Sequence, residues 1–384
     1  MSSHRIVIQR RMASLLPATL IAVLVVTSFL PAVPRAQAQD RLHVVASFSI
    51  LADVVHNVAG DAAEVESLIP YGANPHSFEP SAQDVVTLSD ADVIFMLGMN
   101  FEEGLQDVVQ EAATGTVYEL WNCLPIRSAA EAFSGIDDHD HAADEDHGED
   151  EHEHDADEHH DEDEHEHADE TGDLCANHTA AVQTVFGLGT LVLPGTVTQD
   201  DPHYFEVLAE VDPHVWTDPV NVALWTLMIR DMLSAEDPAN ADIYAANADA
   251  YLAELAALHT EVNALIETIP VEKRVIVTNH LAANYFAQRY GLELVGVVIP
   301  GGSTSAEPSV QDVLNLITTI QEQGVPAIFT ETTVSDSLAK QIADESGAQI
   351  VSLYTGSLSE SDGPAATYID YTRFNATQIT EALR

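Results

Sequence analysis

The sequence contains very little positive charge. Lys273 and Lys340 are its only lysines, and Lys and Arg together number 13 against 63 Asp and Glu in 384 residues. A formal net charge of −50 repels nucleic acid and anionic membrane surfaces, so we exclude both as partners. Without the 21 acidic residues of one segment described below, the net charge is still −29, so the rest of the chain is acidic as well.

Long apolar runs are also missing, except near the N-terminus. Arg5, Arg10 and Arg11 precede the apolar stretch 15–30, and Ala36-Gln37-Ala38 follows as a cleavage motif. This order predicts a signal peptide over residues 1–38. The alternative is an uncleaved anchor, but the stretch is short for a bilayer span. No cysteine stands at the cleavage site to carry lipid, so we expect a soluble periplasmic protein.

Cysteine is scarce, and its placement is informative. Cys123 and Cys175 are the only two, and they flank the segment 137–173. In an oxidising compartment they are expected to close this segment into a disulfide-bounded loop; the alternative is two free thiols.

The segment 137–173 has an extreme composition. It holds 12 Asp, 9 Glu and 9 His in 37 positions and no apolar residue larger than alanine. We expect it to be disordered, because nothing offsets the entropy of ordering and its carboxylates repel one another. Imidazole beside carboxylate, many times over, predicts loose binding of divalent metals; the alternative is a solvated acidic tether.

Short apolar runs alternate with amphipathic stretches on both sides of this insertion. The predicted strands are 42–47, 63–69, 92–97, 116–120, 274–278, 292–298, 326–330 and 349–353. The predicted helices are 50–58, 81–88, 102–113 and one from Pro219, then others beginning near residues 280, 307, 335 and 367. Alternation of this kind predicts parallel sheets covered by helices, that is, an α/β fold.

One helix is predicted to be much longer than the others. It opens at Pro238, and large apolar residues recur at spacings of three, four or seven up to residue 269. We therefore expect an N-terminal lobe over 39–236, a rigid linker helix over 237–269 and a C-terminal lobe over 270–384. Each lobe is expected to hold a roughly four-stranded, mostly parallel sheet.

Three histidines outside the insertion stand at comparable places. His76 follows the second predicted strand, His280 follows the strand 274–278 directly, and His214 precedes a helix. Open α/β sheets bind ligands at the carboxyl ends of their strands. A proline directly before His76 and His214 restricts the backbone there. The occurrence of such histidines in both lobes predicts one metal site between the lobes.

Several motifs resemble the substrate-binding proteins of metal-uptake ABC transporters, the ZnuA-like family for zinc and its manganese relatives. The motifs that show this resemblance are VVASFSILADVVHNVAGD, NPHSFEPS, DPHVWTDPVN, NHLAANYFAQRYGL, GGSTSAEPS, IFTET and TYIDYTRFN, and they occur in the family's order. The resemblance implies a two-lobed fold, metal ligation by His76, His214 and His280, and a membrane permease as partner.

One departure from the family bears on the metal. Many members supply an aspartate near the end of the chain where this sequence has Gly356. The site is then three imidazoles plus water, or plus a carboxylate such as Glu331. Three neutral nitrogens favour Zn²⁺ over Mn²⁺, and the manganese relatives carry Glu where this chain has His280. Glu331 is expected either to orient a ligand or to lie at the surface, and His203 is a candidate auxiliary ligand.

These expectations define three functional hypotheses. The first is a monomeric, non-enzymatic receptor that captures Zn²⁺ as its transported ligand, or manganese or another divalent metal, and delivers it to a permease. The second is a zinc hydrolase, which the lack of an HExxH motif or any other catalytic motif argues against. The third is a periplasmic zinc store or chaperone in which the segment 137–173 does the binding.

Overall fold

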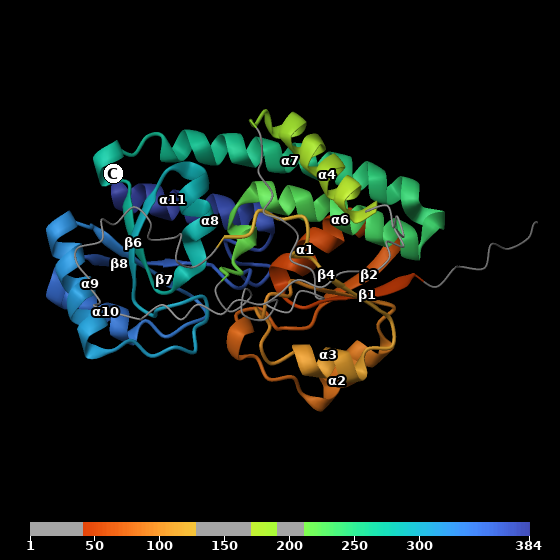
Figure 1. Ribbon diagram of the computed structural model, residues 1–384, viewed down its shortest axis with the longest axis horizontal. Helices are drawn as coiled ribbons and strands as arrows, with labels where there is room; N and C mark the ends of the chain where they lie inside the picture. The colour runs from red at the N-terminus through yellow and green to blue at the C-terminus, as the bar shows by residue number, and fades with distance from the viewer. Residues whose placement is uncertain (1–40, 128–169, 190–210) are drawn as a thin grey trace, which may run out of the picture. The chain divides into compact units, whose positions relative to one another are not determined.

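Two parallel four-stranded sheets organise the protein (Figure 1). The computed structural model describes residues 41–127, 170–189 and 211–384. The first sheet contains β1 (Leu42–Ala46), β2 (Ala63–Ser67), β3 (Val93–Met96) and β4 (Thr116–Glu119) in the order β2-β1-β3-β4. The second contains β5 (Val275–Thr278), β6 (Glu293–Val297), β7 (Ala327–Glu331) and β8 (Gln349–Leu353) in the order β6-β5-β7-β8.

The two sheets share one topology, and every pairing in them is parallel. The central strands read as continuous apolar runs because helices cover both of their faces; all four residues of β3 and all five of β7 are buried. The strand order of each sheet reverses between β1 and β3 or between β5 and β7, and open α/β sheets bind ligands at the carboxyl ends of the strands at such a point. The predicted α/β fold with two four-stranded sheets is confirmed.

Helices fill the intervals between strands much as the sequence predicts. The first lobe has α1 (Ser49–Ala59), α2 (Ala82–Asp90), α3 (Gln106–Ala112), α4 (Glu170–Phe186) and α6 (Pro219–Glu236), with the short turns η2 (Pro75–Ser77) and η4 (Val215–Thr217). The second lobe has α8 (Asn284–Tyr290), α9 (Val310–Gln323), α10 (Ser337–Ser346) and α11 (Tyr368–Leu383), with the turn η7 (Leu281–Ala283). Ser81 and Ser309 close matching capping boxes on α2 and α9, which fixes where these helices begin.

The long predicted helix is α7 (Ala241–Ile266), preceded by the turn η5 (Pro238–Asn240). It packs against α1 and α6 of the first lobe and against α11 of the second (Figure 1). Its buried residues are Tyr244, Ala248, Tyr251, Leu252, Leu255, Leu258, Val262 and Ile266. They belong to a core cluster that includes side chains from both sheets, so α7 connects the lobes through packed apolar surface. The lobe boundaries at residues 236 and 270 stay a prediction.

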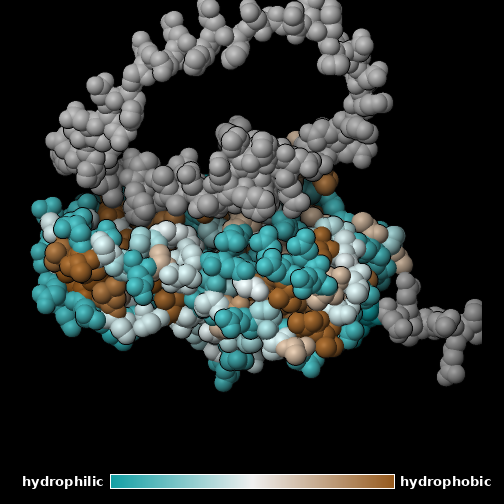
Figure 2. Space-filling model, turned by 60° about the horizontal axis from the view of Figure 1, so that its bottom comes forward, coloured by the Kyte–Doolittle hydropathy of each residue, from teal (hydrophilic) through white to brown (hydrophobic). Residues whose placement is uncertain are grey.

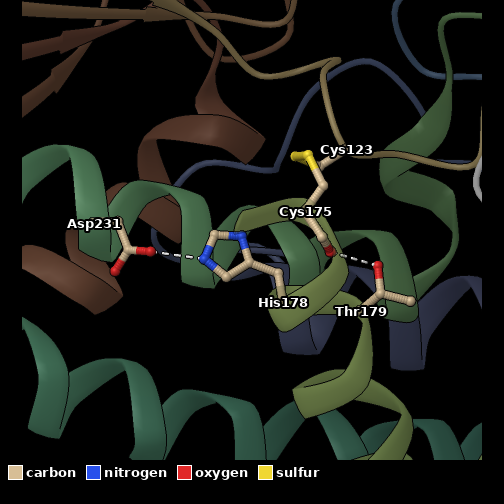
Figure 3. The surroundings of a disulfide bond; sticks show 5 residues. All are labelled: Cys123, Cys175, His178, Thr179 and Asp231. Carbon is tan, nitrogen blue, oxygen red and sulfur yellow. Dashed lines mark hydrogen bonds and ion pairs between the residues drawn. A yellow bond between two sulfur atoms is a disulfide. The ribbon is translucent and has the colours of Figure 1, made fainter. Parts of the chain in front are cut away.

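The patterns do not predict α4. It begins at Glu170, so the last residues of the acidic segment, 170–173, belong to a helix, and it packs against α6 and α7. A disulfide joins Cys175 in α4 to Cys123, which follows β4 (Figure 3). One turn further along α4, the buried His178 pairs through Nε2 with Asp231 Oδ2 of α6 at 2.7 Å. Covalent and polar contacts together attach α4 to the first lobe.

Some predicted features lie outside the described residues: the signal peptide, residues 137–169 of the acidic segment, and His203. None of the helices in the described ranges combines the length and hydrophobicity needed to traverse a bilayer. On the face shown in Figure 2, apolar side chains form separate patches divided by polar ones. Exposed apolar pairs include Val310 and Leu314 on α9 and Val85 and Val86 on α2.

Candidate metal centre

His76 reaches the site from a short turn after β2. Pro75 occupies the first position of η2, and the Asn74 side chain caps the turn by accepting a hydrogen bond from the His76 backbone N–H at 3.1 Å. The imidazole is buried, and its Nδ1 has no hydrogen-bond partner among the described residues. The nearest acid is Glu103, whose Oε1 lies 3.9 Å from this Nδ1.

His214 precedes η4, and its position depends on Asp212. Both residues are buried. Asp212 Oδ1 accepts hydrogen bonds from the His214 backbone N–H at 3.0 Å and from its ring Nδ1 at 2.8 Å. Asp212 Oδ2 accepts from Asn284 at 3.1 Å, so α8 of the second lobe holds the carboxylate in turn. The Asp-Pro-His motif therefore carries its own orienting group.

His280 follows β5 at the edge where β5 meets β7. Its Nδ1 donates to Oε1 of Glu331, the last residue of β7, and the other oxygen of Glu331 accepts from the Thr355 hydroxyl. Glu331 is 6% exposed, so it does not lie at the surface. Of the three roles that the sequence leaves open for Glu331, as a ligand, an orienting group or a surface residue, the structure shows the orienting one, because the carboxylate contacts Nδ1 on the far side of the ring.

The Nε2 atoms of the three histidines converge. His214 Nε2 lies 3.2 Å from His76 Nε2 and 2.9 Å from His280 Nε2, and one nitrogen from each ring falls within 4.8 Å of the others. Two nitrogens bound tetrahedrally to zinc at about 2.05 Å stand about 3.3 Å apart, which is close to this spacing. All three side chains are at least 95% buried.

The tautomers of the imidazoles determine what the close approach of their Nε2 atoms requires. A neutral imidazole that donates from Nδ1 carries only a lone pair on Nε2. His214 and His280 both contact carboxylates through Nδ1, so with both rings neutral two lone pairs would face each other at 2.9 Å. This arrangement is repulsive unless a cation lies between the nitrogens. Carboxylates behind imidazoles are the usual means of orienting metal ligands and raising their basicity.

Burial controls the charge of the site. Burial and the neighbouring imidazoles lower the pKa of His76 to about 2, and burial with the charge of His280 lowers the pKa of His214 well below its usual value. The imidazoles of His76 and His214 are therefore neutral at pH 7, the form that binds metal.

The two orienting carboxylates, Asp212 and Glu331, differ in the direction in which their pKa values are shifted. Burial raises the pKa of Asp212 to about 7, despite the hydrogen bonds that it accepts from the His214 backbone and Asn284. Burial also disfavours charge on Glu331, but the charge of His280 and the hydrogen bonds from His280 and Thr355 outweigh it, and the pKa lies below its usual value. Glu331 is thus the permanent negative charge next to the site, and a bound cation would favour the charged form of Asp212 as well.

Aromatic side chains surround the imidazoles on the first-lobe side. The Phe101 ring meets the His76 ring edge to face at 4.9 Å between centroids, and Trp216 lies 5.2 Å from His214. Phe101 and Trp216 also contact each other and Phe48. These rings exclude water and leave the imidazole nitrogens as the polar groups that face the centre.

Gly356 stands where the family resemblance implies an aspartate, and it lies against the turn that carries His76. A Cβ built on Gly356 would lie 3.0 Å from Cδ of Pro75, the residue before His76. A side chain here requires Pro75 to move by a few tenths of an ångström. Among the described residues, the group able to hold a metal consists of the three histidines alone.

Some of these residues have no role that the sequence patterns predict. Asp212 belongs to the same motif as His214, and its spacing of two residues is the signal that could have identified it. His178 received no role either, yet this buried side chain pairs with the partly exposed Asp231 beside the disulfide (Figure 3). His43, also unassigned, contacts Glu66 at the surface at 2.7 Å.

The chain is similar to known metal-binding proteins along most of its length. Residues 44–382 match the ZnuA family, described as zinc-uptake complex component A, periplasmic. The manganese-binding lipoprotein MntA of Halalkalibacterium halodurans is 28% identical over 90% of this chain and 89% of its own. The manganese ABC transporter substrate-binding lipoprotein PsaA of Streptococcus pneumoniae is 25% identical over 90% of this chain and 89% of its own.

Solved structures share the fold. The periplasmic zinc-binding protein TroA of Treponema pallidum superposes with a TM-score of 0.62 at 22% identity, covering 89% of this chain and 99% of that one. The match to the ZnuA family spans both sheets, α7 and all three histidines of the centre. The chain therefore belongs to the ZnuA family, the substrate-binding proteins of metal-importing ABC transporters.

Proposed function

We propose that this protein captures Zn²⁺ with His76, His214 and His280 and delivers it to the membrane permease of an ABC importer. The observation that carries the proposal is the approach of the His214 and His280 Nε2 atoms to 2.9 Å, with a carboxylate in contact with Nδ1 behind each ring. A third neutral imidazole, His76, completes a ligand set typical of zinc with an open fourth position for water.

The donor set supports zinc over manganese. Mn²⁺ prefers oxygen ligands, whereas this centre offers three nitrogens, and Gly356 contributes no carboxylate. Manganese remains the competing candidate, because relatives such as MntA and PsaA are named for it. An incomplete protein ligand set also suits a carrier, since the metal has to be released again.

The rest of the chain fits an extracytoplasmic carrier. We infer a soluble periplasmic monomer after removal of residues 1–38, with residues 237–269 as the rigid connection between lobes. The disulfide between Cys123 and Cys175 is consistent with an oxidising compartment. The segment 137–173 is proposed as an accessory collector that raises the local zinc concentration near the centre.

The test is a zinc titration of four proteins: the wild type, a variant lacking residues 137–169, the His76→Ala, His214→Ala, His280→Ala triple variant, and the control His56→Ala at an exposed histidine of α1. We expect one tight site in all except the triple variant. A tight site that survives in the triple variant contradicts the proposal. Loss of nearly all capacity on deletion of 137–169 supports the zinc store instead.

A competition titration decides between the metals. Wild-type protein is equilibrated with Zn²⁺ and Mn²⁺ against chelators of known affinity. We expect much tighter binding of Zn²⁺. Equal or tighter binding of Mn²⁺ replaces the zinc assignment with the manganese alternative.

A further inference from the structure

One side chain connects the turn that carries His76 to the opposite lobe. Asn74 accepts the His76 backbone N–H with its Oδ1 at 3.1 Å. The same amide donates from Nδ2 to Oγ1 of Thr304 at 2.8 Å, and Thr304 precedes α9 in the second lobe. Asn74 is half-buried, so water competes only partly with either bond.

The loop that contains Thr304 also reaches the segment that carries His214. A Cβ added to Gly302 would lie 3.3 Å from Cδ of Pro213 and 3.4 Å from the Val211 carbonyl oxygen. Gly302 therefore packs directly against the residues that precede His214. This loop thus contacts the segments that precede His76 and His214, the two proposed ligands from the first lobe.

His76 depends on such support more than the other two ligands do. Carboxylates hold the rings of His214 and His280 through Nδ1, but Nδ1 of His76 has no hydrogen-bond partner in the described part of the chain. The Phe101 ring lies beside the His76 ring, and Glu103 Oε1 lies 3.9 Å from its Nδ1, beyond hydrogen-bond distance, so the orientation of the ring depends strongly on its backbone. Asn74 fixes that backbone.

We propose that Asn74 and Thr304 form a latch between the lobes that positions His76 and slows the release of bound zinc. Both are positioning residues, since neither side chain belongs to the ligand group. The inference rests on the proposed function, because it presumes that zinc binds at the three histidines. When the lobes separate, the bond between Asn74 and Thr304 breaks, and His76 loses its link to the second lobe. A separated latch thus favours release, and a closed one favours retention.

The test measures zinc dissociation after mixing zinc-loaded protein with excess chromophoric chelator. Thr304→Val keeps the side-chain shape but removes the hydroxyl that accepts from Asn74. Loss of one partly buried hydrogen bond predicts release about three- to tenfold faster, with an unchanged association rate. Thr304→Ser keeps the hydroxyl and should restore slow release. Thr318→Val on the exposed face of α9 is the matched control and should release zinc at the wild-type rate.

A double-mutant cycle adds a second criterion. After Asn74→Ala the hydroxyl of Thr304 has no latch partner, so adding Thr304→Val should accelerate release no further. Fully additive effects of the two substitutions overturn the latch. Wild-type release from Thr304→Val, or equally fast release from Thr304→Ser, also overturns it.

The latch and the proposed function fail in different ways. Tight zinc binding by the triple histidine variant refutes the proposed function. Wild-type release rates in Thr304→Val, while the triple variant has lost the tight site, refute the latch alone.

Discussion

Replacing Glu331 with glutamine tests whether the charge behind His280 determines metal affinity. The glutamine keeps an oxygen that can accept from His280 Nδ1, and its size is unchanged. What disappears is the negative charge at the end of β7, where the side chain is buried. The amide NH₂ also faces Thr355, whose hydroxyl then has to accept instead of donate.

The magnitude follows from the type of hydrogen bond. A hydrogen bond to a charged group contributes about 1.5–3 kcal/mol and a neutral one about 0.5–1.5 kcal/mol, so the exchange costs about 1–1.5 kcal/mol. A loss of 1.4 kcal/mol is about tenfold in affinity. Removal of a group behind a metal-bound imidazole typically weakens metal binding about 10–100-fold, so we expect zinc affinity to fall at least about tenfold.

The assay is a competition titration of Zn²⁺ against a chromophoric chelator at pH 7. Glu322→Gln, at an exposed position on α9, removes the same charge far from any histidine contact and should bind zinc as the wild type does. Wild-type affinity in Glu331→Gln refutes the orienting role. A loss as large as that of His280→Ala shows instead that Glu331 is itself a ligand.

Three further predictions concern stability, each measured by denaturant unfolding. The Cys123–Cys175 disulfide links residues 52 apart in sequence, so its reduction should lower the free energy of unfolding by about 4 kcal/mol on the chain-entropy model. An unchanged midpoint of denaturant unfolding after addition of reductant contradicts this prediction. Burial raises the pKa of Asp231, but hydrogen bonds from His178 and Arg230 outweigh this and lower the pKa to about 2. The stability advantage of the wild type over Asp231→Asn should therefore be full above pH 4 and shrink as the pH falls toward 2. A difference in stability that stays constant with pH argues against the pair. Leu255→Ala in the fully buried stripe of α7 should cost about 2–5 kcal/mol, and a cost below 1 kcal/mol shows that α7 is not packed as described.

Local patterns were enough to predict the strands and most helices. Each strand is a short apolar run bounded by turn residues, and burial on both faces makes such runs easy to recognise. The helix α4 was not predicted because it begins within an acidic segment and contains Gly172, Thr171 and Asn177, which interrupt an amphipathic pattern. Its packing against α6 and α7, with the disulfide, stabilises a helix that its own sequence specifies weakly.

The identity of the three histidines was already visible in the sequence, because each follows a strand or precedes a helix within a distinctive motif. Their chemistry was not. The role of Glu331 stayed open until β7 was found beside β5, since 51 residues separate Glu331 from His280 and strand order decides whether they meet. The contact between Asn74 and Thr304 spans 230 residues and depends on how the lobes face each other.

Periodicity, composition and motif order therefore determined the α/β class, the metal-handling character and the candidate ligands, because these depend on residues close together in the chain. The tertiary structure decided which carboxylate supports which imidazole, that the Nε2 atoms of three histidines converge, and that Gly356 lies against Pro75. Those properties arise from groups brought together by the packing of two separate sheets, and no local pattern encodes such a distance.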